Sequence, residues 1–118
     1  MVIYIYGKMY GVKDYNYPAF LEAEYVLRRL GYEVVNPART GVQEGWEWKD
    51  YLKKDLLDML TKNVDTVVTL EGWEDLRGAR LEFHVAKELG MKIISMKEFL
   101  KLHGLGYNNG KYTPLNNY

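Results

Sequence analysis

The sequence contains no cysteine, no long apolar run and no excess of either charge. Without cysteine, neither a disulfide framework nor a thiolate zinc site can form. No apolar run approaches the roughly 18 residues that a membrane helix needs, and the first residues lack the layout of a signal peptide. The 16 basic residues balance 16 acidic ones, which argues against a broad surface for nucleic acid or membrane. We therefore expect a cytoplasmic protein that binds no nucleic-acid polymer and no membrane.

What the chain does contain is an alternation of strand-like and helix-like segments, and 118 residues suffice for one small domain. A β-prone run ends at Gly7, Pro18 suits the first turn of a helix, and Gly31 and Gly90 suit helix ends. In the third helix we expect Leu81, Val85, Ala86 and Leu89 to face inward. The predicted strands cover residues 2–6, 32–35, 65–70 and 91–95, and the predicted helices cover residues 18–30, 46–60, 79–89 and 96–102.

Strands that alternate with helices through short loops predict right-handed crossovers and a parallel α/β sheet of four or five strands. The usual strand order is then 2-1-3-4, with any fifth strand after the fourth, and it reverses between the first and third strands. Ligands bind beyond the carboxyl ends of the strands at that reversal. The loops after Tyr6 and Leu70 are therefore the predicted site. We assign residues 1–103 to the domain and residues 104–118 to a tail without a periodic pattern.

Glu82 falls in the first turn of the third helix, near free backbone N–H groups and the positive end of the helix dipole. That position favours an ionised carboxylate, which is what a nucleophile toward a sugar carbon requires. A simple helix-start acid is the alternative. Asp55 either faces the same cleft or is a solvated charge on the second helix, and Tyr4 either reaches a carboxylate or fills the core.

Other loop residues have weaker signals. Arg77 beside Gly78 is a candidate anion ligand, because backbone N–H groups and a guanidinium would converge there. Trp48 and Trp73 flank loops, where they either stack on a base or pack at the edge of the core. His84 and His103 are isolated and show no ligand spacing, so we assign neither to a metal and predict no metal site.

Several segments resemble those of proteins related to the nucleoside 2-deoxyribosyltransferases. Residues 3–9 are similar to the Tyr-x-Ala-Gly-Pro-Met opening of that superfamily. Residues 16–20, 36–38, 72–74 and 77–82 are similar to a branch of short phage and bacterial proteins. The ordered series of motifs spans about residues 2–95.

The resemblance implies a flavodoxin-like three-layer sandwich and a mechanism in which a glutamate attacks the anomeric carbon, assisted by a tyrosine and an aspartate. The glutamate corresponds to Glu82, between Gly78 and Ala86 of the family pattern, and the helpers correspond to Tyr4 and Asp55. The chain departs from relatives at Leu76, where a serine is frequent, and at Lys8, where proline is usual. The residues implied in substrate binding are Gly7, Lys8, Met9, Trp48, Gly72, Trp73, Arg77 and Gly78.

In the transferases, residues near the C-terminus of a neighbouring subunit complete the site. Asn108, Asn109 or Tyr118 would do so here, which implies a homo-oligomer.

Three functional hypotheses follow. The first is an N-glycosidase that acts on a (deoxy)nucleoside or nucleoside 5′-monophosphate by hydrolysis or base exchange, without a cofactor, in the cytoplasm of a bacterium or of a phage-infected host. The second is a protein that binds or sequesters a nucleotide signal without cleaving it, as a phage counter-defence protein would. The third is a structural or protein-interaction role that rests on the tail.

Overall fold

A parallel sheet of four strands forms the centre of the computed structural model, which describes residues 1–9, 11–76, 79–108 and 111–114. The strands lie in the order β2-β1-β3-β4, and each neighbouring pair is parallel. The predicted order and the reversal between β1 and β3 are confirmed, with four strands in the sheet. The strands are β1 (Val2–Tyr6), β2 (Glu33–Val35), β3 (Thr66–Thr69) and β4 (Lys92–Ser95).

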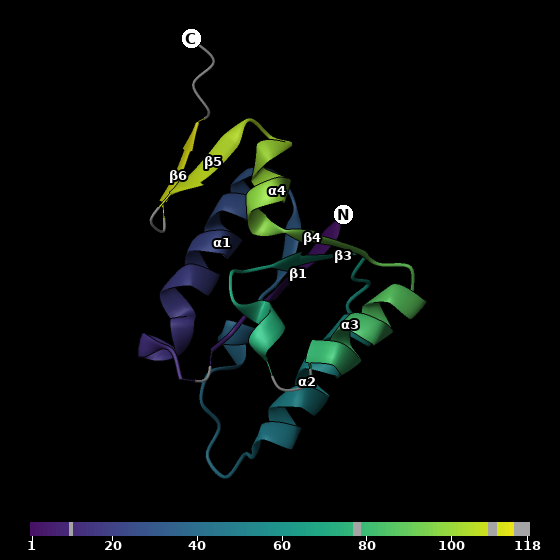
Figure 1. The fold of residues 1–118 in the computed structure, drawn as a ribbon. Coiled ribbons are helices and arrows are strands. Elements are labelled where there is room, and N and C mark those ends of the chain that lie inside the picture. The colour runs from purple at the N-terminus through teal and green to yellow at the C-terminus, as the bar shows by residue number, and fades with distance from the viewer. Residues whose placement is uncertain (10, 77–78, 109–110, 115–118) are drawn as a thin grey trace.

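Two pairs of helices cover the sheet (Figure 1). One face carries α1 (Tyr17–Arg29) and α4 (Met96–Lys101), and the other carries α2 (Trp48–Thr61) and α3 (Ala79–Glu88). The result is the three-layer, flavodoxin-like arrangement. No helix among the described residues is long and apolar enough to cross a membrane.

The central strand β1 divides the core into two clusters. Because successive strand side chains point to opposite faces, Ile3 and Ile5 pack toward α1 and α4, whereas Tyr4 and Tyr6 pack toward α2 and α3. Two tyrosines on one face of a buried strand place two phenolic hydroxyls between the sheet and the helices. This layer contains the candidate site.

The inward face of α3 agrees with the prediction in part. Ala86 is buried as predicted, whereas Leu81 and Leu89 are about half exposed and Glu82 is buried in their place. Residues 82 and 86 are four apart and therefore share one face of the helix. Because the side chain of Ala86 is small, α3 can pack close to the sheet. The Glu82 side chain, on the same face of the helix, therefore lies between α3 and the sheet.

The ends of the elements follow local hydrogen bonds. The helix α2 begins at Trp48, two residues after the predicted start, because the Asp50 carboxylate accepts a hydrogen bond from the Glu47 N–H at 2.8 Å and fixes the first turn there. Trp46 lies before the helix and packs edge-on against Tyr51, with ring centroids 5.0 Å apart.

The segment after α4 is more ordered than predicted. Its strands β5 (Leu105–Asn108) and β6 (Lys111–Pro114) pair antiparallel in a sheet of their own, and Leu105 packs against the core beside α1 and α4. Unlike the β-branched run of β3, the sequences of β5 and β6 contain Gly, Asn and Pro, which are uncommon in strands. The loops also contain the short helices η1 (Lys13–Asn16), η2 (Pro37–Thr40) and η3 (Trp73–Asp75).

Candidate active site

The candidate site lies where β1 and β3 end side by side. Tyr6 and Thr69 are aligned partners at the carboxyl ends of these strands, at the point where the strand order reverses. A small cavity opens here on the side of α2 and α3, and Tyr6, Thr69, Trp73, Glu82 and Phe83 contribute to its lining. Its volume of about 10 Å³ is room for about one water molecule.

Glu82 is buried in the first turn of α3, with 6% of its surface exposed. Burial and then the negative charge of Asp55 raise the pKa of its carboxyl, the nearby Tyr6 hydroxyl acts in the opposite direction, and the net pKa is about 8. The sequence predicts an ionised carboxylate from the helix dipole. The structure differs because burial outweighs the partial charge at the helix end, so Glu82 holds a proton at neutral pH.

Asp55 lies on α2 and is not a solvated charge. Burial raises the pKa of its carboxyl most and the charge of Asp58 adds to this, whereas the Tyr4 hydroxyl and the Lys54 ammonium lower it; the net pKa is about 7. Lys54 itself is held by Asp58, with Nζ–O distances of 2.7 and 2.8 Å. Lys54 and Asp58 thus form an ion pair beside Asp55, and the Asp55 carboxyl keeps its elevated pKa.

The two tyrosines of β1 connect these carboxyls. Tyr4 is fully buried, and its pKa is raised by burial and then by the charges of Asp55, Glu82 and Asp58, all three of which disfavour ionisation of its hydroxyl. Burial and then the charge of Glu82 raise the pKa of Tyr6. Each hydroxyl lies near a carboxyl, Tyr4 near Asp55 and Tyr6 near Glu82.

These neighbours do not form well-aligned hydrogen bonds. Tyr4 Oη, Tyr6 Oη and Glu82 Oε2 are buried and have no hydrogen-bond partner among the described residues. Buried polar atoms without partners are rare and frequently mark a place for a water or a ligand. The structure thus brings together the three predicted residues and adds Tyr6. The family resemblance predicts a role for Tyr4. Tyr6 could have been found only from the two-residue period of β1, which places its side chain on the same face of the sheet as Tyr4.

The residues of the first loop that were predicted to bind substrate, Gly7, Lys8 and Met9, make other contacts. A Cβ added to Gly7 would lie 2.9 Å from Leu70 Cβ and 3.0 Å from Phe20 Cζ, so glycine is required there for packing. The Lys8 carbonyl accepts a hydrogen bond from Asn16 Nδ2 at 2.8 Å, and Met9 packs against the core on the α1 side. Neither the Lys8 nor the Met9 side chain lines the cavity beside Glu82.

The loop after β3 contributes directly through Trp73. Gly72 adopts a left-handed conformation with φ of +87°, which turns the chain into η3. Trp73 then meets Tyr6 edge-on, with centroids 5.9 Å apart, and stacks on Phe83 at 5.8 Å. Leu76 packs against the core beside α2 and α3. The aromatic side chains of Trp73 and Phe83 therefore cover the cavity.

Trp48 is 41% exposed in the first turn of α2, and it is not among the residues that line the cavity. Arg77, Gly78, Asn109 and Tyr118 lie outside the described residues, and for Asn108 the backbone alone, at the end of β5, is described. Within the described part of the chain, no group of three or more histidine, aspartate or glutamate side chains is placed to hold a metal ion.

Comparison with protein families gives one match. Residues 1–95 match the model of a family described as a domain of unknown function (DUF4406). The match includes the whole parallel sheet and every residue of the site. A search among curated proteins found no match. The description names no activity, so the resemblance to deoxyribosyltransferases stays a prediction.

Proposed function

The chain belongs to the DUF4406 family, and from its site we propose that it is an N-glycosidase acting on a nucleoside or nucleoside 5′-monophosphate. The proposed reaction breaks the bond between the sugar C1′ and the base nitrogen. Glu82 would act as nucleophile, Asp55 as proton donor, and Tyr4 and Tyr6 would position the two carboxyls.

One observation carries this proposal. Two carboxyls with pKa values raised into the neutral range, Asp55 at about 7 and Glu82 at about 8, lie in one layer with two unpaired tyrosine hydroxyls at the strand reversal. Enzymes that cleave glycosidic bonds commonly use two carboxyl groups whose pKa values are shifted by their surroundings, because one must donate a proton while the other bears negative charge.

The proposed steps balance protons and bonds. A Glu82 oxygen attacks C1′, the bond from C1′ to the base breaks, and the departing nitrogen takes the proton of Asp55. Water then attacks C1′ and gives its proton to Asp55, which releases the sugar and restores the Glu82 carboxylate. A second base in place of the water would give base exchange.

The reaction requires one proton on the carboxyl pair. Burial raises the pKa of both carboxyls into the neutral range, so the pair of Asp55 and Glu82 retains a proton near neutral pH. A sugar carbon that gains positive charge favours the ionised form of Glu82 and leaves the proton on Asp55.

The cavity beside Glu82 admits about one water and no sugar ring. A substrate would therefore have to displace the side chains of Trp73 and Phe83. Their rings are stacked, with an angle of 10° between the ring planes. Aromatic faces of this kind stack well on a base, so displacement would exchange one stacking contact for another.

A chromatographic assay for free base tests the proposal. Wild type is incubated with a panel of nucleosides and 5′-monophosphates, beside Glu82→Gln, Asp55→Asn and the control Glu88→Gln, which changes an exposed acid of the same helix. We expect base release by wild type and Glu88→Gln and a loss of at least about 100-fold in the other two. Equal release by Glu82→Gln would refute the role of Glu82.

A second candidate is nucleotide binding without cleavage, as in sequestration of a signal. The observation that favours it is the small volume of the cavity, which leaves no space for a sugar against Glu82. The same panel distinguishes the two functions, because intact nucleotide retained by the protein without free base supports sequestration.

A further inference from the structure

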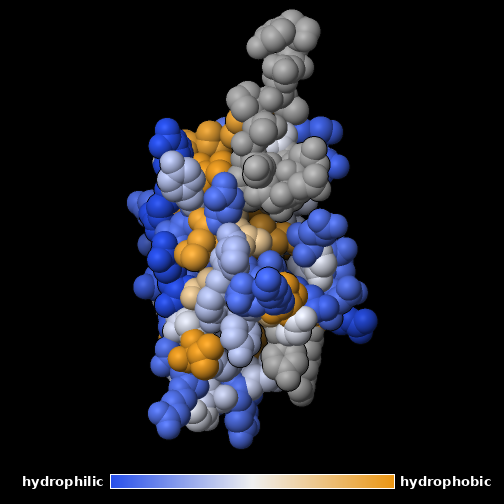
Figure 2. Space-filling model, turned by 90° about the vertical axis from the view of Figure 1, so that its left-hand side faces the viewer, coloured by the Kyte–Doolittle hydropathy of each residue, from blue (hydrophilic) through white to orange (hydrophobic). Residues whose placement is uncertain are grey.

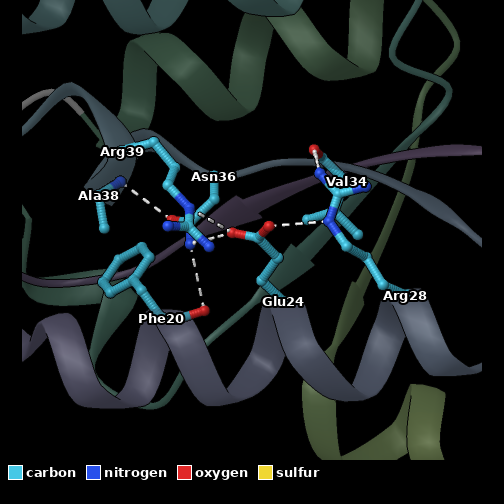
Figure 3. Close-up of polar contacts among 7 residues, drawn as sticks. All are labelled: Phe20, Glu24, Arg28, Val34, Asn36, Ala38 and Arg39. Atoms are coloured by element: carbon cyan, nitrogen blue, oxygen red, sulfur yellow. Dashed lines mark hydrogen bonds and ion pairs between the residues drawn. The ribbon is translucent and has the colours of Figure 1, made fainter.

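A second cluster of charged residues lies on α1, on the opposite side of the sheet from Glu82. Its centre is Glu24, whose side chain is only 8% exposed. The Glu24 carboxylate accepts hydrogen bonds from Arg28 Nε at 2.8 Å, Arg39 Nε at 3.0 Å and Asn36 Nδ2 at 2.9 Å (Figure 3). Burial raises the pKa of Glu24, but these three donors outweigh it and lower the pKa to about 2. The carboxylate is thus permanently charged and fixes two arginines.

The polar network extends into the backbone and is rigid. Asn36 Oδ1 accepts a hydrogen bond from the Ala38 N–H at 2.9 Å, and Arg28 Nη2 donates to the Val34 carbonyl at 3.0 Å. Each arginine is therefore anchored through its Nε, which leaves the outer amino groups of Arg39 and Nη1 of Arg28 without a hydrogen bond to the described residues. Anchored guanidinium groups with spare donors are preorganised for a further anion.

These arginines line a surface hollow of about 470 Å³, together with Leu21, Tyr25 and Arg29. Arg29 lies over the Tyr25 ring at 5.5 Å and donates to its hydroxyl at 3.2 Å. Figure 2 shows this side of the molecule, the left-hand side of Figure 1, where hydrophilic and hydrophobic side chains lie next to one another. The hollow is within the range of volumes of small-molecule sites, unlike the cavity beside Glu82.

The charges of the hollow do not balance. Three guanidinium groups face one carboxylate, and Glu24 is the only acid paired with them among the described residues, which leaves two positive charges in excess. Glu24 pairs with both Arg28 and Arg39, whereas Arg29 has no ion pair among the described residues, so a single carboxylate neutralises only one of the three positive charges. An anion with about two negative charges would neutralise this excess.

We propose that this hollow is a binding site for an organic phosphate, with the phosphate between Arg28, Arg29 and Arg39. A phosphate monoester carries about 1.5 to 2 negative charges at neutral pH and offers several acceptor oxygens, which matches the excess charge and the spare donors. The exposed apolar side chains Leu21 and Tyr25 form the wall against which the organic part would pack. This site is separate from Glu82, and it does not depend on the proposed glycosidase activity.

Calorimetric titration with inorganic phosphate, ribose 5-phosphate and ribose tests the site. The variants are Arg29→Gln, which removes a guanidinium that contacts the ring and hydroxyl of Tyr25, and Arg39→Lys, which keeps the charge and removes the planar guanidinium. Lys53→Gln, an exposed residue of α2, controls for the loss of one positive charge, and Glu82→Gln controls for binding at the other site. Thermal unfolding checks that each variant is folded.

We expect wild type, Lys53→Gln and Glu82→Gln to bind ribose 5-phosphate more tightly than phosphate and not to bind ribose. Arg29→Gln and Arg39→Lys should each weaken binding about tenfold, and added salt should weaken it in every protein that binds. The proposal is overturned if folded Arg29→Gln and Arg39→Lys bind as wild type does, or if wild type binds neither phosphate compound at 10 mM, a concentration chosen to reveal roughly millimolar affinity.

Discussion

The Tyr6 hydroxyl lies beside the buried Glu82 carboxyl, and neither Tyr6 Oη nor Glu82 Oε2 has a hydrogen-bond partner among the described residues. Both oxygen atoms are therefore free to form hydrogen bonds with a bound molecule. Because the Tyr6 hydroxyl favours the ionised form of Glu82, its removal should raise the pKa of that carboxyl further. This relationship leads to the first prediction.

Tyr6→Phe should keep the fold and lose activity. Removal of an unpaired buried hydroxyl is expected to change the free energy of unfolding by less than about 1 kcal/mol, whereas the alkaline limb of the activity profile should move to higher pH. Urea unfolding and a pH series of base release measure the two effects. An unmoved alkaline limb would contradict the pairing of Tyr6 with Glu82.

Stability should fall as the pH rises through the range in which Glu82 ionises. The folded pKa of about 8 exceeds the ordinary value of 4.5, so the folded state holds a proton that the unfolded chain has lost. The stabilisation is complete below about pH 4.5 and disappears as the pH passes 8. Glu82→Gln should be more stable than wild type at pH 9, by up to about 5 kcal/mol, as measured by chemical unfolding.

The control for this measurement is Glu88→Gln, because Glu88 is exposed on the same helix. Its stability should follow the wild-type curve between pH 5 and 9. Parallel curves for wild type and Glu82→Gln would show that Glu82 is not buried with a raised pKa.

Base release by the wild-type protein should have a bell-shaped dependence on pH. The proposed reaction needs one proton on the pair of Asp55 and Glu82, so the acid limb should lie near the pKa of about 7 and the alkaline limb near about 8. The measurement is kcat/KM from pH 5 to 10. A profile that is flat across pH 6 to 9 would exclude titration of this pair from the mechanism.

Glu24→Gln should destabilise the protein at neutral pH and cease to do so in acid. The substitution removes the charge that pairs with Arg28 and Arg39; both arginines are more than half exposed, so we expect a loss of about 1–2 kcal/mol. The folded pKa of about 2 lies below the ordinary 4.5, so the contribution is present above pH 4.5 and is lost toward pH 2.

Unfolding by urea at pH 7 and at pH 2.5 measures this difference. Glu22→Gln, an exposed residue of the same helix, is the matched control and should leave stability unchanged at both values. A Glu24→Gln loss of the same size at both pH values would mean that packing, and not charge, makes the contribution.

Gly7→Ala should destabilise the protein by about 1–3 kcal/mol through overpacking. The added methyl group would lie 2.9 Å from Leu70 Cβ and 3.0 Å from Phe20 Cζ, and Leu70 Cβ cannot rotate away because it is the first atom of its side chain. Thermal unfolding measures the change. A melting temperature equal to that of wild type would show that β1 and the end of β3 can separate.

Much of the fold could be predicted because its signals are local. The β-branched run of β3, the proline at the start of α1 and the glycine after it are all read within a few residues, and their alternation then implies a parallel sheet. The location of the site followed from strand order. The hairpin of β5 and β6 could not be predicted in this way, because its strands contain Gly, Asn and Pro in place of a β-branched run and pair with each other instead of joining the parallel sheet.

The sequence by itself determined the alternation of strands and helices, the reversal between β1 and β3, and the presence of a glutamate at the start of α3. The tertiary structure alone decided that Glu82 is buried near Asp55, that the hydroxyls of Tyr4 and Tyr6 lie near these two carboxyls, and that Glu24 pairs with two arginines on the other face. The physical reason is that helix and strand propensities act over a few neighbouring residues, whereas a pKa depends on the burial and charge that distant segments bring.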